Sequence, residues 1–209
     1  VIFSGGLSLS GALTSNNGSI TATTLTVDSI ELNDGTVITE ELTVVDDVAI
    51  HDGAVLTVPS ADLATKHVFG LDVVAGGTVS IDLGGQINLN GKGYLANNYS
   101  GPDFSDDTRA GSHAGVFYGS DASTVYGRYE RAKYAGSASQ ASGGGLLDLQ
   151  ADNLVLDGTI VVDGLTTANN RKGAGGSVHI DVNNLSGGIE GLFSANGGRA
   201  TSGRSSRIL

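Results

Sequence analysis

Residues 25–37 read LTVDSIELNDGTV, and residues 42–55 read LTVVDDVAIHDGAV. In both stretches apolar side chains mostly alternate with polar ones, which is the period of a strand with one buried face. The many Thr and Val residues also favour extended structure. Leu25 matches Leu42 and Ile30 matches Val48, so the offset between the stretches lengthens slightly along the repeat. The sequence therefore predicts short strands that recur along the chain.

A second repeat has a longer period. Residues 144–154 read GGLLDLQADNL and residues 175–185 read GGSVHIDVNNL, and the apolar residues at positions 147, 149, 151 and 154 are all matched by apolar residues in the second stretch. Short repeated strands with Gly- or Asn-rich corners are typical of solenoids, in which stacked coils bury an apolar face that no coil can bury alone. We therefore predict an all-β fold, a right-handed parallel β-helix (solenoid), with residues 1–209 as a single domain. The period alone also allows a left-handed or a two-sheet variant.

The composition agrees with a thin, repeated core. The chain has 33 Gly among 209 residues, no Cys, Met or Trp, and only five Phe and six Tyr. Such a shortage of large aromatic residues argues against one compact globular core. The absence of Cys excludes a disulfide framework. No apolar run approaches the roughly 20 residues of a transmembrane helix, so we expect no membrane insertion.

The charge of the chain is strongly acidic. The formal net charge is −11, which argues against nucleic-acid binding, because that requires a basic face. Residues 1–100 contain only two basic side chains, Lys66 and Lys92, whereas Arg199, Arg204 and Arg207 lie near the end. An acidic front and a basic tail could attract each other between molecules. The alternative is a solvated surface with no such role.

Residues 91–143 interrupt the repeat and contain every Tyr of the chain. We predict one large Gly/Tyr-rich loop excursion over this range, because a long connection of this kind is usually functional when it is ordered. Tyr and Arg are enriched at contact centres, and Tyr rings also stack on sugars. The alternative is that these rings fill a local core. The predicted contact residues are Tyr99, Tyr118, Tyr126, Tyr129, Arg128 and Arg131.

A group of carboxylates in the same range is the candidate metal site. Asp103, Asp106 and Asp107 lie near Arg109 and His113 in the sequence. Carboxylates are suitable ligands for Ca²⁺, although the spacing matches neither an EF-hand nor a Gly-Asp calcium repeat. The alternatives are a polar surface loop and a carboxylate pair for glycoside hydrolysis. The chain has no nucleophile elbow and no zinc-binding His spacing, so we predict no catalytic residue and no other cofactor.

Several Gly-rich runs resemble a known family. They are VAGGTVSID at residues 74–82, GSHAG at 111–115 and GGSVHI at 175–180. These runs are similar to those of adhesin-type Gly-rich repeat proteins that bacteria secrete, and the likeness spans about residues 71–198. The resemblance implies a right-handed parallel β-helix at the cell surface or outside the cell, and it carries over no catalytic residue. Because Val1 is not an initiator Met, we also expect a processed chain or a fragment.

These observations together predict an extracellular structural protein, either a surface adhesin or a fibre-forming subunit. The fibre would form by head-to-tail solenoid stacking through terminal strands near residues 2–13 and 192–209, because open ends favour contacts that do not close. The partner would be another copy of the chain or another surface protein. The alternative is a β-helix that binds or cleaves carbohydrate, including the phage tail-fibre type, with a polysaccharide as ligand.

Overall fold

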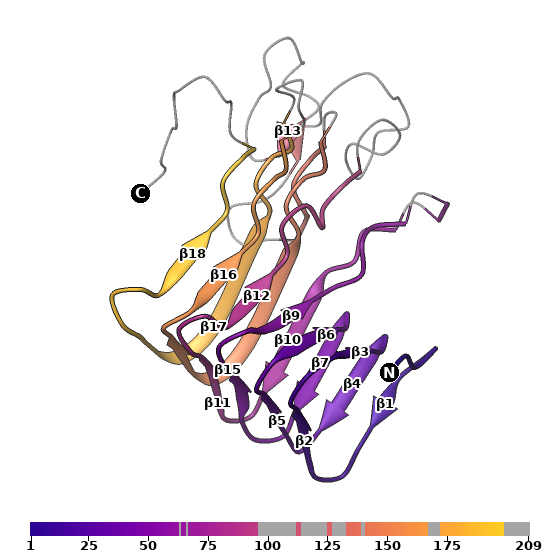
Figure 1. The fold of residues 1–209 in the computed structure, drawn as a ribbon. Helices are drawn as coiled ribbons and strands as arrows, with labels where there is room; N and C mark the ends of the chain where they lie inside the picture. The colour runs from indigo at the N-terminus through magenta and orange to yellow at the C-terminus, as the bar shows by residue number, and fades with distance from the viewer. Residues whose placement is uncertain are drawn as a thin grey trace.

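The computed structural model describes residues 1–62, 64–65, 67–95, 112–113, 125–126, 133–138, 141–166 and 172–198. Within these ranges the chain forms strands, turns and extended segments, and no described residue lies in a helix. Every pair of neighbouring named strands runs parallel. Figure 1 shows the strands sharing one tilt, with the arrows of β4 and β7 pointing the opposite way from those of β3 and β6.

The larger sheet has ten strands and curls into a half-barrel. The order along its path is β1 (Leu7–Ser8), β4 (Thr24–Val27), β7 (Glu41–Val44), β10 (Leu71–Ala75), β15 (Leu146–Leu156), β11 (Thr78–Ile81), β8 (Val48–Ile50), β5 (Ser29–Leu32) and β2 (Ala12–Ser15). The tenth strand, β17 (Ser177–Ser186), pairs with β15. Strands β1 and β2 are consecutive in the chain, yet they lie at opposite ends of this path.

The second sheet is separate and has six strands. Their order is β18 (Leu192–Ser194), β16 (Thr159–Val161), β12 (Gln86–Asn88), β9 (Ala54–Thr57), β6 (Gly35–Ile38) and β3 (Ser19–Thr21). A further pair of short strands, β13 (Ser112–His113) and β14 (Val125–Tyr126), forms a third small sheet.

The prediction of a right-handed parallel β-helix (solenoid) is wrong. The strands form a curled half-barrel and a separate second sheet, which is not a solenoid. The long strand β15 is the physical cause, because its first half pairs with β10 at Leu147 and its second half with β11 at Leu154. The row formed by β1, β4, β7 and β10 and the row formed by β2, β5, β8 and β11 thereby join into one sheet. The predicted excursion over 91–143 lies mostly outside the described residues.

The sequence repeats nevertheless predicted much of the register. Leu25 pairs with Leu42, and the longer repeat pairs Leu147 with Val178. The offset of 18 residues between Ile30 and Val48 predicts that Val37 pairs with Val55, and this prediction is wrong, since Val37 pairs with the next residue, Leu56. The turn that precedes β9 is slightly longer than the turn that precedes β6, and this shifts the later pairing.

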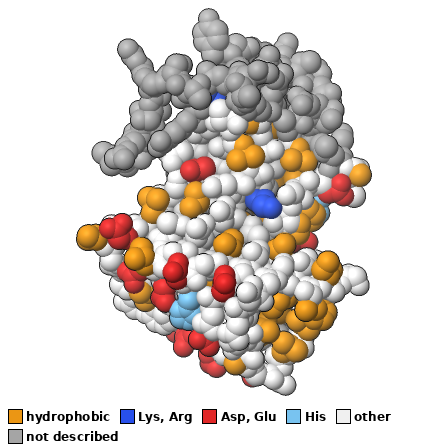
Figure 2. Space-filling view, in the orientation of Figure 1, with side chains coloured by type: hydrophobic (Ala, Val, Ile, Leu, Met, Phe, Trp, Pro, Cys, Tyr) orange, Lys and Arg blue, Asp and Glu red, His pale blue; other side chains and the backbone are white. Residues whose placement is uncertain are grey.

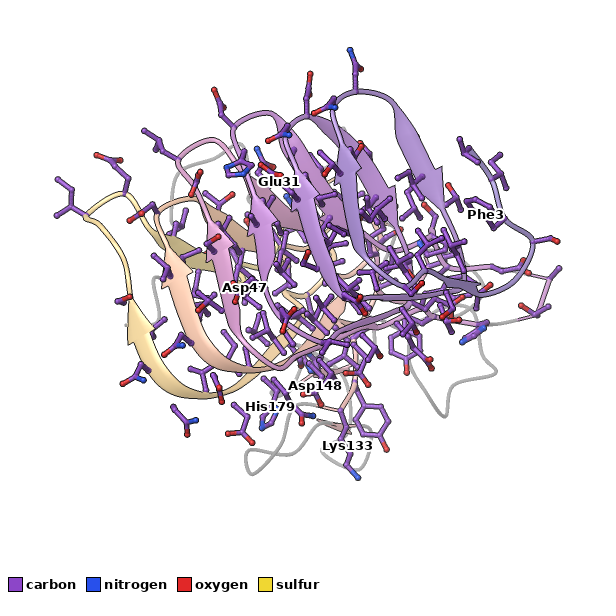
Figure 3. The ribbon with its side chains drawn as sticks, turned by 90° about the horizontal axis from the view of Figure 1, so that it is seen from below. Phe3, Glu31, Asp47, Lys133, Asp148 and His179 are labelled. Carbon is purple, nitrogen blue, oxygen red and sulfur yellow. The ribbon has the colours of Figure 1, made fainter. Side chains whose placement is uncertain are left out.

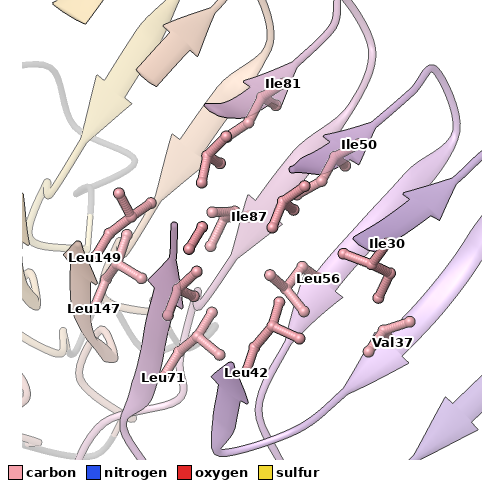
Figure 4. Packing of buried hydrophobic residues seen from close by; sticks show 14 of the residues in the cluster. Ile30, Val37, Leu42, Ile50, Leu56, Leu71, Ile81, Ile87, Leu147 and Leu149 are labelled. Carbon is pink, nitrogen blue, oxygen red and sulfur yellow. The ribbon is translucent and has the colours of Figure 1, made fainter. Parts of the chain in front are cut away.

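A continuous apolar core fills the space between the inner faces of the sheets. It combines residues from the curled sheet, such as Leu42 and Ile81, with residues from the second sheet, such as Leu56 and Ile87. These four side chains are at most 1% exposed, and Figure 4 shows them packed in successive layers. Each fully buried Leu or Ile contributes about 1.5–3 kcal/mol. The core therefore depends on many medium-sized aliphatic side chains and on few aromatic ones.

Candidate functional site

Beyond the ends of β12, β16 and β18, the chain leaves the sheets and continues as extended glycine-rich segments. We call these segments the glycine base, and it is built from stretches of chain far apart in the sequence. They are residues 91–94, 135–138, 142–145, 162–165, 173–176 and 195–198. In Figure 1 they lie in the upper part of the molecule, around β13.

Backbone hydrogen bonds hold the glycine base together. Gly136 N donates to Gly144 O over 2.8 Å, and Gly144 N donates to Ala174 O over 2.9 Å. Ala174 N in turn donates to Ser137 O over 2.8 Å. Three distant segments are thus tied to one another through main-chain groups, which satisfies donors and acceptors that would be costly to bury unpaired.

The absence of side chains is what permits this packing. A Cβ atom on Gly143 would overlap the carbonyl oxygen of Gly136, and a Cβ atom on Gly144 would overlap that of Val162. Backbones approach each other this closely only where glycine occupies the contact. The Gly-rich composition of this range therefore reflects close main-chain packing, and not the solenoid corners and the loop that the sequence predicted.

The glycine base also anchors the chain on both sides of the tyrosine-rich segments, which lie within residues 96–132. Tyr94, which precedes them, donates its N–H to Gly136 O and accepts a bond from Gly143 N, each over 3.1 Å. His113 lies between two of them, and its Nδ1 is 3.0 Å from Gly175 O. Ala135 follows them and is buried in the same cluster as Tyr94. Tyr94, His113 and Ala135, the described residues next to these segments, are therefore all held by the glycine base.

The predicted contact and metal residues themselves lie outside the described residues. This holds for Tyr99, Tyr118, Tyr129, Arg128 and Arg131, and for Asp103, Asp106 and Asp107. Tyr126 lies in β14, which pairs with β13 beside the base, and its side chain is not described. Among the residues that the structure describes, no group of three or more His, Asp or Glu is arranged to hold a metal ion.

His113 is the titratable group most closely integrated with the glycine base. Besides the contact with Gly175, its Nε2 lies 3.2 Å from Ser177 Oγ. Burial lowers the pKa of His113, and the hydrogen bond with the Gly175 carbonyl opposes this effect. The imidazole is consequently neutral near pH 7. Sequence reasoning placed His113 beside a candidate calcium loop and missed its pairing with Ser177, which lies far along the chain.

A row of polar side chains crosses the outer face of the curled sheet near the base. Glu41, Asp72, Asp148 and His179 occupy paired positions on four neighbouring strands. Asp148 Oδ1 lies 2.9 Å from His179 Nδ1, and Figure 3 shows the two side chains together. The position of His179 between Val178 and Ile180 predicts that its side chain points outward, but the sequence does not indicate which carboxylate is its partner.

A second polar row follows the turns at the opposite ends of the strands. Asn33 Nδ2 donates to Asn16 Oδ1 over 2.9 Å, and His51 Nδ1 lies 2.6 Å from Asp82 Oδ2. Figure 2 shows acidic side chains around a histidine at the lower left of the molecule. Exposed pairs of this kind contribute little stability because solvent screens them.

The same turns line an open hollow of about 350 Å³. Asp82, Asp157 and Glu190 supply carboxylates, and Leu83 and Ile189 supply apolar contacts. Ile189 is fully exposed. Asp157 already accepts a hydrogen bond from the N–H of Gly188, so at least one of the carboxylates serves the turn itself.

No protein-family model matches this chain, and no curated protein or solved structure matches it either. The resemblance to secreted adhesin-type proteins therefore stays a prediction. The part of the chain that the structure describes contains no helix long and apolar enough to cross a membrane.

Proposed function

We propose that this protein is an extracellular adhesin, in which the glycine base supports tyrosine- and arginine-bearing segments that bind a partner on a cell surface. The observation that supports the proposal is the shared anchoring of Tyr94, His113 and Ala135, because these described residues flank the segments in question. Binding residues are often carried on connections that a rigid scaffold positions.

The residue types in these segments suit a protein partner. Residues 96–132 contain four Tyr together with Arg109, Arg128 and Arg131. Tyr and Arg are the residue types that most often dominate the energy of protein contacts. The three arginines lie among five acidic side chains, Asp103, Asp106, Asp107, Asp121 and Glu130, so these segments offer charges of both signs to a partner.

The test is binding to intact cells or to an array of surface proteins. The variant replaces Tyr99, Tyr118, Tyr126 and Tyr129 by Ala, and the matched control replaces the same four residues by Phe. We expect the Ala variant to lose at least about 30-fold in affinity, since hot-spot truncations cost about 2 kcal/mol or more each. The Phe control retains the rings and most of the binding. Equal binding by the Ala variant and the wild type would refute the proposal, and selective binding to glycans would favour a polysaccharide partner.

A second candidate function, a fibre-forming subunit, is favoured by the edges of the sheets. No charged side chain precedes Asp28 in the sequence, and Val1 and Ile2 are 77% and 83% exposed. At the other side, Leu192 and Phe193 of β18 are 49% and 42% exposed. Edge strands without charges are ready to pair with another chain. Here the pairing would join sheet edges of two copies, not solenoid ends.

Sedimentation velocity and electron microscopy of undiluted protein test this second candidate. The double variant Ile2→Lys with Phe193→Lys is expected to abolish fibres or oligomers, because each Lys would place a charge at an apolar edge. Val45→Lys is the control, since Val45 is 60% exposed and lies just after β7. If the wild-type protein stays monomeric at high concentration, the proposal of a fibre-forming subunit is refuted.

A further inference from the structure

A serine and a histidine meet beside the glycine base in an arrangement suited to covalent chemistry. Ser177 begins β17, and its Oγ lies 3.2 Å from Nε2 of His113. The other ring nitrogen of His113, Nδ1, lies 3.0 Å from the carbonyl oxygen of Gly175. A nucleophile, a base and a third group that orients the base are the three parts of an activated serine.

The partners of His113 determine where its proton lies. A carbonyl oxygen can only accept, so Nδ1 carries the hydrogen and donates it to Gly175 O. Nε2 then presents its lone pair toward Ser177, and this lone pair accepts the proton of the hydroxyl. Serine nucleophiles use this tautomer, with a main-chain carbonyl here in the place that a carboxylate occupies in the Ser-His-Asp arrangement.

We infer that Ser177 is a nucleophile activated by His113 and that the site transfers small acyl groups from esters. Ser177 Oγ would attack the ester carbonyl carbon while its proton moves to His113 Nε2. The bond from the carbonyl carbon to the leaving alcohol oxygen would then break, and the alcohol would take the proton from Nε2. Water, deprotonated by the same nitrogen, would hydrolyse the acyl-serine and restore the hydroxyl, so that no oxidant or cofactor is required.

The neighbours of Ser177 indicate the class of ester. Leu146 pairs with Ser177 and packs against the cluster of Tyr94 and Ala135, which gives an apolar wall for a short acyl chain. His179 lies two positions after Ser177 and therefore on the same side of the strand. It is hydrogen-bonded to Asp148, and both groups can contact hydroxyls. A short-chain ester of a polyhydroxylated alcohol, such as an acetylated sugar, fits this environment.

The experiment measures covalent labelling of the complete chain by a fluorophosphonate probe, with the modified residue mapped by mass spectrometry. Hydrolysis of p-nitrophenyl acetate is followed in parallel. We expect labelling at Ser177, its loss in Ser177→Ala, and a rate at least about 100-fold lower in His113→Gln, as for removal of a general base. Ser186→Ala is the matched control, because Ser186 is an exposed residue of the same strand, and it should react like the wild type.

The result that would overturn the inference is the absence of label on Ser177, or equal rates for the wild type and the His113 variant. Circular dichroism first establishes that each variant retains the strand signal. If His113→Gln does not fold, the pH profile of wild-type labelling replaces it. The rate should then fall as His113 becomes protonated in acid, and a profile that stays flat down to the lowest pH at which the strand signal persists would contradict a role of an imidazole base.

Discussion

The stacked sheets and the glycine base hold the same chain together in opposite ways. In the sheets, side chains such as Leu42 and Leu56 fill a continuous core and are almost completely buried. In the base, Gly136, Gly143 and Gly144 have no side chains, and the backbones themselves are in contact. The first region is stabilised mainly by apolar burial, and the second by hydrogen bonds between tightly packed main chains.

This difference determines which substitutions each region can accept. The sheet core should respond to the loss of side-chain volume, because a cavity remains where atoms are removed. The glycine base should respond to the addition of even one methyl group, because the space is already filled by backbone. The two regions therefore have opposite sensitivities, and stability measurements on single variants can test whether the distinction is correct.

The largest effect is expected in the sheet core. Leu56→Ala removes a side chain with 0% exposure, so the free energy of unfolding should fall by about 2–5 kcal/mol. Val55→Ala is the control, since Val55 is next to it in β9 and only half-buried. Denaturant titration followed by circular dichroism gives both values. Equal losses for the two variants would show that the proposed core is not the main source of stability.

A smaller but clear effect is expected in the glycine base. Gly143→Ala places a methyl group against the carbonyl of Gly136, and we expect a loss of about 1–3 kcal/mol. Gly197→Ala is the matched control within the base, because the nearest atom to its added Cβ is 3.7 Å away. It should change the stability by no more than about 0.5 kcal/mol. If both variants match the wild type in denaturant titrations, close backbone packing is not a requirement.

The smallest effect concerns pH and separates the base from the sheets. Burial lowers the pKa of His113 below its ordinary value of 6.5, so the unfolded chain binds this proton more readily than the folded one. The stabilising contribution is present above pH 6.5 and is lost as the pH falls through the folded-state pKa. Thermal melts from about pH 8 to pH 5 should show this loss in the wild type. His113→Gln should have a flatter profile in the same range.

The sequence predicted the register between neighbouring repeats far better than it predicted how β15 joins the two rows of strands. Alternation and self-similarity were sufficient for the register of Leu25 with Leu42 and of Leu147 with Val178. They could not show that β15 joins two rows, because a shift of the buried positions from Leu147 and Leu149 to Leu154 and Leu156 does not reveal which strands each half pairs with. They also could not distinguish loop glycines from glycines in close backbone contact, since Gly144 meets a distant segment of the chain there. The contact of His113 with Ser177 has no periodic signal at all.

The position of β15 also has a consequence for the order in which the protein folds. Leu25 and its partner Leu42 are close in the sequence, whereas Leu71 and its partner Leu147 are several times further apart. Closing the longer loop costs about 1.3 kcal/mol more in chain entropy, from the logarithmic dependence on length. Strands β1 to β12 can therefore assemble from nearby partners while β15 is still being synthesised or is still unpaired. The step that joins the two rows of strands is then a late event, and it depends on a nucleus that already exists.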